Sequence, residues 1–294
     1  MSDKRMKTAL VSVFHKDGLD EIITTLHKEG VQLLSTGGTQ EFIESLGVPC
    51  RRGEGLTGYP SSLGGRVKTR RPKVFGGILG RRDLESDQVQ MVNYEIPEID
   101  LVIVDLYPFE ATVASGASHE AIIEKIDIGG ISLIRAAAKN HKDVVIVASK
   151  DQYAALADIL RNKGAQTTLE ERVWFAKEAF AVSSLYDSAI FNYFDGDNAS
   201  MFRKAVNHPK SLRYGENPHQ NAKFYATLDK VPFSLATAEQ LNGKELSYNN
   251  IQDANAALNI VREFEAPFCV GLKHMNPCGA AIGTDVVDAW KKAY

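Results

Sequence analysis

The feature that most constrains the fold is an alternation, near the start of the chain, of short apolar runs with segments that have one apolar face. Residues 8–14 form a β-branched apolar run typical of a buried strand. Residues 18–29 have the spacing of a helix with one buried face, with apolar side chains at Leu19, Ile22, Ile23 and Leu26. A second strand at 31–34 and a second helix at 37–46 follow. This βαβα order predicts an α/β fold in which helices cover a parallel sheet.

The same alternation recurs further along the chain and extends the predicted sheet. Residues 101–106 and 144–148 have the apolar runs of strands, whereas residues 119–126 and 153–160 have helical spacing. A long amphipathic segment at residues 170–194 carries several aromatic side chains, which favours a packing helix over a cofactor site. Ligands of α/β folds bind where the strands end, so the residues that follow each strand are the first candidates for a site.

A polar stretch at residues 195–200 predicts a boundary between two domains, at residues 1–198 and 199–294. The length of 294 residues is more than one ordinary core needs, which agrees with two domains or with one domain and part of another. In the second part we expect a loop at 211–220, a helix at 253–264, a buried strand at 267–272 that opens into the stretch at 273–279, and a helix from Asp285. This last helical pattern still runs at Tyr294, so we expect the second domain to be truncated.

The balance of charges argues against partners that need a strong electrostatic field. The chain has 34 basic and 37 acidic residues and a formal net charge of −3, so we expect neither nucleic acid nor membrane among its partners. The apolar run at 8–14 is too short for a secretory signal, and no stretch of about eighteen apolar residues is present. The three cysteines have no metal-binding spacing and are Cys50, Cys269 and Cys278. We expect reduced thiols in a cytoplasmic protein without a metal site.

Two glycine-bearing stretches of the first domain are candidates for binding a phosphate. The sequence STGGT at residues 35–39 lies between a predicted strand and a predicted helix, where free N–H groups could bind an anion, although helix capping alone explains the same composition. The sequence GGRVKT at residues 64–69 places Arg66 and Lys68 on one side of an extended run, where they could hold a phosphate and an anionic transition state. A solvated run of charges is the alternative, because further cations follow at Arg70, Arg71 and Lys73.

Two further candidate groups lie at the ends of predicted elements. Asp105 and Tyr107 stand at the carboxyl end of a predicted strand, although a Tyr-Pro corner also simply ends a strand. Asp127 is a candidate N-cap for a helix at residues 131–139, and Lys139 lies in the last turn of that helix. In a single unbroken helix the two residues would be about 18 Å apart. The segment therefore bends, or the two residues touch different parts of a long ligand, or one serves a neighbouring subunit, unless both only cap the helix.

The second part of the chain carries two candidate groups. Arg213 and Tyr214 open the loop RYGENPHQ, and their guanidinium and ring suit a phosphate and a planar base, although an ordinary polar connection has a similar composition. Lys273 and His274 directly follow the strand predicted at 267–272. A histidine there could act as a general base and the ammonium could stabilise negative charge, while a structural or solvated histidine is the alternative.

Nine stretches together resemble the AICAR transformylase/IMP cyclohydrolase family of purine biosynthesis. They occur in the order of that family between Ala9 and Tyr294, and they are LLSTGGT, GYPSSLGGRVKT, KVFGGILGRR, DLYPF, IEKIDIGG, IRAAAKNHKDV, LRYGENPHQ, LSYNNIQDANAAL and KHMNPCGAAIG. The resemblance implies a methylglyoxal-synthase-like parallel-sheet domain, followed by the first part of a cytidine-deaminase-like α/β transformylase domain. It also implies a homodimer.

For the first domain, the resemblance implies closure of the purine ring of FAICAR to give IMP with loss of water, without metal or organic cofactor. Lys139 would be the proton donor and acceptor, while Lys68, Tyr107 and Asp127 would position the formamide and assist proton movement. The nucleotide site would be lined by Phe14, His15, Lys16, Thr36, Gly37, Gly38, Thr39, Arg66, Val67, Thr69, Val104, Asp105 and Ile128. A dehydrative cyclisation needs acid–base help and held geometry more than a strong nucleophile, which agrees with these roles.

For the second part, the resemblance implies transfer of a formyl group to AICAR from 10-formyltetrahydrofolate as co-substrate. His274 would remove a proton from the AICAR amine and Lys273 would stabilise the transition state, while Arg213 and Tyr214 would bind the nucleotide. Many contacts of the family's transformylase site lie beyond Tyr294, so we expect this site to be incomplete in the chain.

One departure from the family pattern bears on activity. The family continues RVKT with Leu-His-Pro, whereas this chain has Arg70, Arg71 and Pro72. The added cations could disturb packing near Lys68, or raise nucleotide affinity while lowering turnover. IMP cyclohydrolase is the leading hypothesis. A nucleotide-binding module without turnover is the alternative, although it would not need the set Lys68, Tyr107, Asp127 and Lys139, and the catalytic motifs of methylglyoxal synthase are not found.

Overall fold

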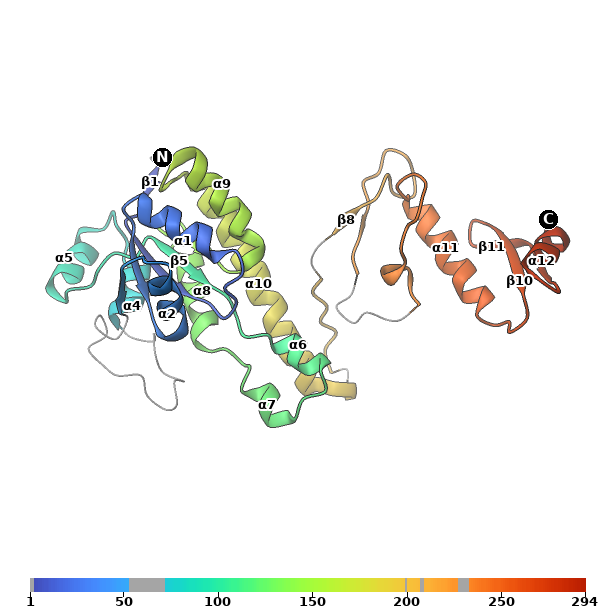
Figure 1. Ribbon diagram of the computed structural model, residues 1–294, viewed down its shortest axis with the longest axis horizontal. Helices are drawn as coiled ribbons and strands as arrows, with labels where there is room; N and C mark the ends of the chain where they lie inside the picture. Colours follow the sequence, from blue (N-terminus) through green and yellow to red (C-terminus); the bar gives the residue numbers. More distant parts are fainter. Residues whose placement is uncertain (1–2, 53–71, 199, 207–208, 227–232) are drawn as a thin grey trace. The chain divides into compact units, whose positions relative to one another are not determined.

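The structure is a computed structural model that describes residues 3–52, 72–198, 200–206, 209–226 and 233–294 (Figure 1). The chain divides into two compact units, Met1–Arg203 and Lys204–Tyr294, which we describe separately. This division lies a few residues after the boundary expected at residue 198. The function that the sequence assigns to each part stays a prediction.

The first unit is built on a five-stranded parallel sheet. In spatial order the strands are β4 (Cys50–Arg52), β3 (Gln32–Ser35), β2 (Thr8–Ser12), β5 (Leu101–Val104) and β6 (Val145–Val147). Every neighbouring pair is parallel, and in the central strand Leu10 stands opposite Leu34 on one side and Val102 on the other. The chain leaves β2 toward β3 and later returns to the other side of β2 as β5. The sheet therefore has a topological switch point between β2 and β5.

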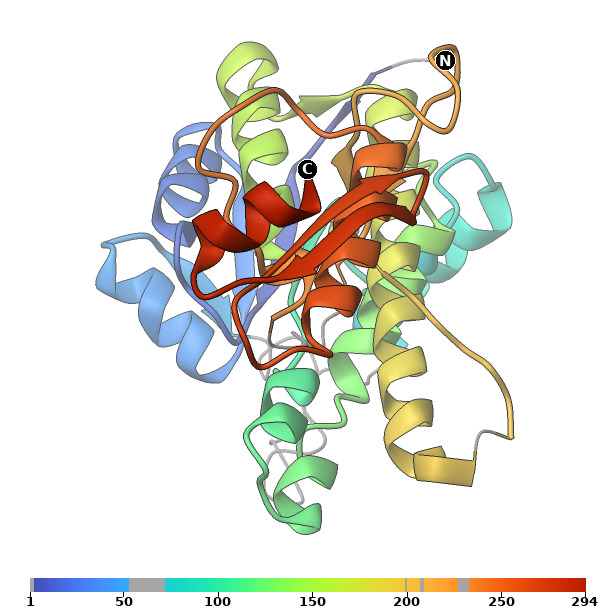
Figure 2. The ribbon, with the colours of Figure 1, turned by 90° about the vertical axis from the view of Figure 1, so that its right-hand side faces the viewer.

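Helices cover both faces of the sheet, because right-handed connections that run in opposite directions along a sheet lie on opposite faces. On one face α1 (Leu19–Lys28), which connects β2 to β3, packs against α9 (Tyr153–Lys163). On the other face α8 (Gly129–Lys139), which connects β5 to β6, packs against the long helix α10 (Leu169–Asp195). Figure 2 shows the blue helices on one side of the strands and the yellow α10 on the other. The predicted α/β parallel-sheet fold is therefore confirmed.

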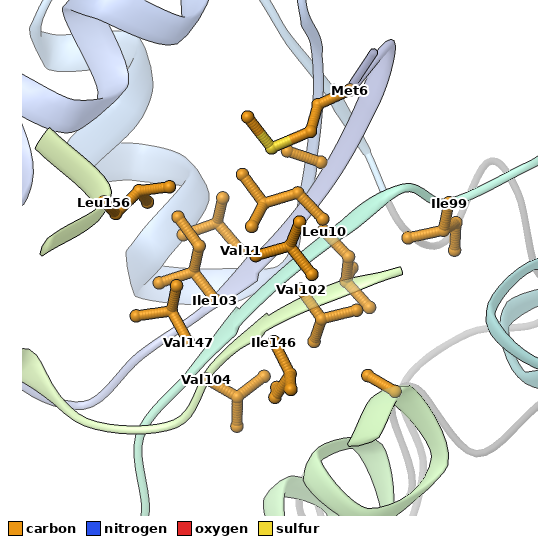
Figure 3. Close-up of a cluster of buried hydrophobic side chains, with 14 of the residues drawn as sticks. Met6, Leu10, Val11, Ile99, Val102, Ile103, Val104, Ile146, Val147 and Leu156 are labelled. Atoms are coloured by element: carbon orange, nitrogen blue, oxygen red, sulfur yellow. The ribbon is translucent and has the colours of Figure 1, made fainter. Parts of the chain in front are cut away.

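The apolar runs that predicted the strands form the core between the helices. Every residue of β5 and β6 is buried, and Leu10 and Val11 of β2 belong to the same cluster (Figure 3). Strands covered on both faces carry continuous apolar runs rather than an alternating pattern. This is why the sequence indicates these strands clearly although it does not fix their ends.

The ends of several predicted elements were wrong by a few residues. The run at 8–14 forms a strand only as far as Ser12, and the run at 101–106 only as far as Val104, because the residues that follow turn away to make the connections at the sheet edge. The helix predicted at 131–139 begins at Gly129. Several short elements were not predicted from the sequence. They are β1 (Lys4–Arg5), β4, α4 (Pro72–Leu79), α5 (Glu85–Asn93), α6 (Phe109–Ala114), the 3-10 turns η2 (Lys150–Gln152) and η3 (Gly196–Asn198), and β7 (Gln166–Thr167).

A second, smaller apolar cluster lies where α6, α7 (His119–Ile123) and the C-terminal half of α10 meet. Its buried side chains are Phe109, Ile122 and Tyr186. Figure 1 shows α6 and α7 in green beside the far end of α10. This cluster fixes the segment between α7 and α8, which carries Asp127.

The described part of the second unit contains two antiparallel strand pairs together with short and longer helical segments. The pairs are β8 (Lys210–Ser211) with β9 (Lys223–Phe224) and β10 (Phe268–Lys273) with β11 (Asn276–Ile282), and the helical segments are η4 (Leu235–Thr237), α11 (Tyr248–Val261) and α12 (Val286–Ala293). The helix predicted at 253–264 begins earlier, because Ser247 and Asn250 form a capping box at its start. The buried strand predicted at 267–272 is present as β10, but none of its residues is buried. It pairs with β11, which was not predicted, as an antiparallel hairpin. No helix in the described part of the chain is long and apolar enough to cross a membrane.

Candidate active site

The carboxyl ends of β2 and β5 meet at the switch point, and one carboxylate joins them. Asp105, just after β5, accepts hydrogen bonds from the backbone N–H groups of Phe14 and His15, just after β2. It also accepts one from Nδ1 of His15, at 3.0 Å. The Asp105 side chain is only 10% exposed. The structure thus brings together three of the predicted site residues, which lie about 90 positions apart in the sequence.

The start of α2 (Gly37–Ser45) lies against the same connection. The Thr39 hydroxyl accepts a hydrogen bond from the Val13 N–H at 3.2 Å and donates one to the Val13 carbonyl at 2.9 Å. Thr36 precedes the helix in an extended conformation, and its side chain makes no capping hydrogen bond. Lys16 donates to the Phe14 carbonyl at 3.1 Å. The first turn of α2 therefore presents its backbone N–H groups at the sheet edge, where a phosphate could bind.

Two exposed aromatic rings border this connection. Phe14 and Tyr107 are 44% and 41% exposed and meet edge to face, with their ring centroids 5.5 Å apart. The ammonium group of Lys125 lies 5.7 Å from the centroid of the Phe14 ring and 5.8 Å from that of Tyr107. Such a cation over ring faces is attracted by their π-electrons. The rings and the cation together offer a surface suited to a planar, electron-rich base.

Asp127 holds the start of α8 at this edge of the sheet. Its Oδ1 accepts a hydrogen bond from the Gly130 N–H at 2.7 Å, although the N-cap position itself is Ile128, whose side chain is exposed. The prediction that Asp127 is the N-cap was therefore wrong by one position. Its side chain nevertheless accepts a hydrogen bond from a free N–H group at the start of the helix, as an N-cap would. Tyr186 of α10 fixes the segment, because its hydroxyl accepts from the Asp127 N–H and donates to the Lys125 carbonyl.

Lys139 lies at the opposite end of α8 and is exposed. The helix is continuous from Gly129 to Lys139, which excludes the bend considered from the sequence. The neighbouring Asn140 donates to the carbonyls of Ile78 and Gly80, and the chain then enters the amino end of β6. Within one chain, Lys139 is therefore at the amino edge of the sheet, while Asp105, Tyr107 and Asp127 lie at the carboxyl edge.

Six of the residues singled out in the sequence lie outside the described residues, namely Arg66, Val67, Lys68, Thr69, Arg70 and Arg71. Val104, by contrast, is described, and its side chain is buried as the last residue of β5. Its contribution to a site is therefore limited to its backbone.

In the second unit, the loop that carries Arg213 and Tyr214 lies at the start of α11. The guanidinium carbon of Arg213 is 4.9 Å from the centroid of the Tyr214 ring, and Arg213 also donates to the Tyr214 hydroxyl at 3.2 Å. The backbone N–H of Tyr248 donates to the Tyr214 carbonyl. Hydrogen bonding with Ser247, and then with Arg213, lowers the pKa of Tyr214. The predicted residues Arg213 and Tyr214 therefore form a cation–π pair.

Lys273 and His274 lie at the tip of the β10–β11 hairpin. His274 and Met275 both have positive φ angles, 52° and 64°, which side chains other than glycine and asparagine rarely adopt. Asp253 of α11 holds the turn by accepting a hydrogen bond from the Met275 N–H at 2.8 Å. Strained backbone of this kind is common at functional sites. Tyr248 and Asp253 are five residues apart on α11, or about 8 Å along its axis, so both predicted groups of the unit lie near one half of this helix.

Comparison with known proteins places this arrangement in a family. The family model described as AICARFT/IMPCHase bienzyme matches residues 137–294, and the model described as MGS-like domain matches residues 18–132. The chain belongs to the AICARFT/IMPCHase bienzyme family. The resemblance identified from the sequence motifs is thus confirmed.

Curated relatives of this bienzyme family match nearly the whole chain. The "Bifunctional purine biosynthesis protein PurH" of Bacteroides thetaiotaomicron is 65% identical over 290 residues, which are 99% of this chain and 56% of the relative. The protein of the same name from Bradyrhizobium diazoefficiens is 49% identical over 301 aligned residues, again 99% of this chain and 56% of the relative. This chain therefore spans about half the length of the curated relatives it matches.

One solved structure is similar to this chain over about two thirds of its length. The protein described by "Crystal structure of ForH" is 32% identical, has a TM-score of 0.55, and covers 64% of this chain and 99% of its own.

Two residues at the candidate site of this family member were missed in the sequence. Lys125 lies in the stretch IEKIDIGG that resembles the family, but nothing in its spacing indicates that its ammonium reaches Phe14 and Tyr107. Tyr153 begins α9 and is buried close enough to Asp105 for the carboxylate to affect its pKa. Among the described residues, no group of three or more His, Cys, Asp or Glu side chains could hold a metal ion.

Proposed function

We propose that the first unit is an IMP cyclohydrolase, which closes the purine ring of FAICAR to give IMP and water in de novo purine biosynthesis in the cytoplasm. One observation carries the proposal. In a chain of this family, the switch point of one parallel sheet brings together the predicted groups of the first unit. They are Asp105 with His15, the Phe14 and Tyr107 rings, Asp127 and the start of α2. This is the place where α/β folds bind nucleotides.

The reaction needs positioned groups and proton transfers. The carboxamide nitrogen of FAICAR forms a bond to the formyl carbon, and the formyl oxygen leaves as water after taking up two protons from the two nitrogens. The N–H groups at the start of α2, around Gly37 and Gly38, suit the phosphate. The rings of Phe14 and Tyr107 suit the base, and Asp127 suits a hydrogen bond to the formamide. Lys68 and its neighbours Arg66, Val67 and Thr69 complete the proposed site.

Lys139 has the proposed role of proton donor and acceptor, and its position limits how it can act. It lies at the opposite end of an unbroken α8 from Asp127, about 18 Å away, and at the opposite edge of the sheet. Of the alternatives considered from the sequence, this geometry favours a second copy of the chain that supplies Lys139 to the site. A homodimer is therefore part of the proposal.

The test is to add FAICAR to the purified chain and to follow the absorbance change as IMP forms. We expect turnover by the parent chain and a kcat about 100-fold lower in Lys139→Ala. Lys142→Ala is the matched control, because Lys142 is an exposed lysine three positions away whose ammonium pairs with Asp83. We expect its kcat to stay within about threefold of the parent value. Tight IMP binding without turnover in the parent would contradict the proposal and favour the nucleotide-binding module.

For the second unit we propose part of the AICAR transformylase site, with 10-formyltetrahydrofolate as co-substrate. Arg213 and Tyr214 would bind the nucleotide, while Lys273 and His274 would act on the amine that receives the formyl group. The support is that both groups lie near the same half of α11. Because the chain spans about half the length of its curated relatives, we expect no formyl transfer when AICAR and the formyl donor are added. Robust transfer would contradict this part.

A further inference from the structure

The pair of His15 and Asp105 has the geometry of a proton-transfer site. We propose that His15 is a catalytic residue that carries a proton during ring closure, and that Asp105 is its positioning residue. This inference rests on the proposed cyclohydrolase function, and it gives His15 a chemical role beyond lining the nucleotide site. It stands on the hydrogen bonds of Asp105, on the contacts that hold residues 13–16, and on the surroundings of the ring.

Asp105 determines which nitrogen of His15 carries a proton. An ionised carboxylate can only accept hydrogen bonds, so the contact of 3.0 Å between Oδ2 and Nδ1 requires a proton on Nδ1. The second nitrogen, Nε2, has no hydrogen-bond partner among the described residues, and the side chain is 39% exposed. In the neutral ring Nε2 is therefore a base that is open to a ligand, and in the imidazolium it is a donor. A carboxylate behind Nδ1 also stabilises the imidazolium.

The ring of His15 is not needed to hold its own connection in place. The backbone N–H groups of Phe14 and His15 already bind Asp105. The Thr39 hydroxyl fixes both polar groups of Val13, and Lys16 fixes the Phe14 carbonyl. Because the backbone alone secures this turn, the third hydrogen bond, to Nδ1, orients the ring rather than the loop. This is the arrangement expected where a histidine must present Nε2 in one direction.

The surroundings of His15 suit the proposed substrate. The His15 ring lies 4.9 Å from the Phe14 ring, centroid to centroid, and Phe14 meets the exposed Tyr107. A base that packs on these aromatic rings would place its substituents near Nε2. Lys125 places a positive charge close to the Phe14 and Tyr107 rings. The site therefore combines a surface for the base, a fixed proton acceptor and a cation.

Ring closure moves two protons from nitrogen to the formyl oxygen, and we assign the first of these transfers to His15. As the carboxamide nitrogen bonds to the formyl carbon, that nitrogen loses a proton and the formyl oxygen gains one. His15 takes the first proton at Nε2 and returns it to the oxygen, so the imidazole ends the step neutral. The formamide nitrogen then loses its proton, the hydroxyl takes up a proton and leaves as water, and the C=N bond forms. Lys139 is the proposed donor and acceptor in this second transfer. No electrons are exchanged with another reagent.

The test compares His15→Asn with the parent chain. An asparagine amide can keep the hydrogen bond to Asp105 but has no group in place of Nε2. We expect kcat to fall by about 100-fold or more, with the Kd of IMP changed by less than about threefold. Asp105→Asn should also lower kcat, because it allows the other tautomer of His15. His27→Asn, at the exposed end of α1, is the control and should behave like the parent.

The pH profile of kcat/KM separates proton transfer from a structural role. We expect the pH profile of the parent to contain an ionisation that is absent in His15→Asn. Among the described residues, the charged or titratable groups in contact with His15 or with its neighbours Phe14 and Asp105 include Asp105, Lys16, Lys125, Tyr107 and Tyr153, and all of them remain in the variant. Thermal unfolding within a few degrees of the parent would show that the variant is folded.

The possible results distinguish this inference from the proposed function. If the parent turns over FAICAR and His15→Asn raises KM and Kd with kcat unchanged, His15 only binds the nucleotide and the inference is wrong. The inference is also wrong if kcat of His15→Asn stays within about threefold of the parent or if its ionisation persists. If the parent binds IMP but has no turnover, the proposed cyclohydrolase function fails, and the proton-transfer role fails with it.

Discussion

Two buried tyrosines at the candidate site differ in the hydrogen bonds of their hydroxyl groups. Tyr186 accepts from the Asp127 N–H at 2.6 Å and donates to the Lys125 carbonyl at 2.9 Å, and burial raises its pKa to about 12. The Tyr153 hydroxyl is buried without a hydrogen-bond partner among the described residues. Burial raises the pKa of Tyr153, and the nearby Asp105 carboxylate adds to the rise. Both hydroxyls therefore stay protonated at neutral pH, but only that of Tyr186 is satisfied.

We expect Tyr153→Phe and Tyr186→Phe to have opposite effects on the free energy of unfolding. Removing the unpartnered hydroxyl of Tyr153 should leave stability unchanged or raise it by up to about 1 kcal/mol. Removing the Tyr186 hydroxyl should cost about 1–3 kcal/mol, because it leaves the Asp127 N–H and the Lys125 carbonyl without their partner. Urea unfolding measures both. A loss of more than about 1 kcal/mol in Tyr153→Phe would show that this hydroxyl has a partner in solution.

At the same scale, the residue types of the site were predictable and their partners were not. Asp105 was identified because it ends an apolar strand, and Asp127 because it precedes a helix. The hydrogen bond from His15 to Asp105 joins residues 90 positions apart, and that of Tyr186 joins residues about 60 apart. Local spacing contains no information on such contacts, because the order of strands in the sheet decides which connections meet.

At the scale of the helices, the first turn of α8 packs closely against the candidate site, because Gly130 lies next to the Asp127 side chain. A Cβ at Gly130 would lie 2.4 Å from Oδ2 of Asp127 and 3.1 Å from a methyl carbon of Leu106. Because the carboxylate is the end of a side chain, it can rotate away and leave the helix intact. Alanine favours the helix over glycine by about 1 kcal/mol, and this gain offsets the crowding caused by the added methyl group.

We expect Gly130→Ala to lower cyclohydrolase activity while leaving the melting temperature close to that of the parent. The physical reason is displacement of the Asp127 carboxylate, which accepts the Gly130 N–H hydrogen bond. A double-mutant cycle supplies the control: in an Asp127→Ala background, Gly130→Ala should cause no further loss of activity and should raise stability by about 1 kcal/mol. Equal activity losses in both backgrounds would mean that the added methyl group acts elsewhere.

At the element scale, the fully buried strands and long helices were predicted, and short or exposed elements were not. β5 and β6 were recognised because strands that are buried on both faces are apolar at every position. β4 has the sequence CRR with two exposed arginines, so no apolar pattern indicates it. The hairpin of β10 and β11 was missed because its two-residue turn is His274–Met275 rather than the Asn-Gly or Asp-Gly typical of such turns.

Over the whole molecule, buried apolar side chains are concentrated in the first unit. Its main cluster includes residues from β2, β3, β5, β6, α1 and α8. In the described part of the second unit, Ala289 is the only buried apolar side chain, while large side chains are exposed at Phe233, Leu241, Val286, Trp290 and Tyr294. A unit of this size normally buries well over half of the surface of its unfolded chain. The sequence contains no indication of this difference in burial, because apolar runs are present in both parts.

We therefore expect the two units to differ in amide hydrogen exchange, measured by mass spectrometry on the intact chain. Peptides from β5 and β6 should exchange only through opening of the whole first unit, because their amides are hydrogen-bonded within a buried sheet. Peptides from α11 and the β10–β11 hairpin should exchange at least about a hundredfold faster, because little apolar burial opposes their local opening. Peptides from the middle of α10, which is long but packed through Phe175 and Ala179, are the internal control and should resemble β5. Protection of the hairpin equal to that of β5 would show that the second unit is stabilised by contacts other than an apolar core of its own.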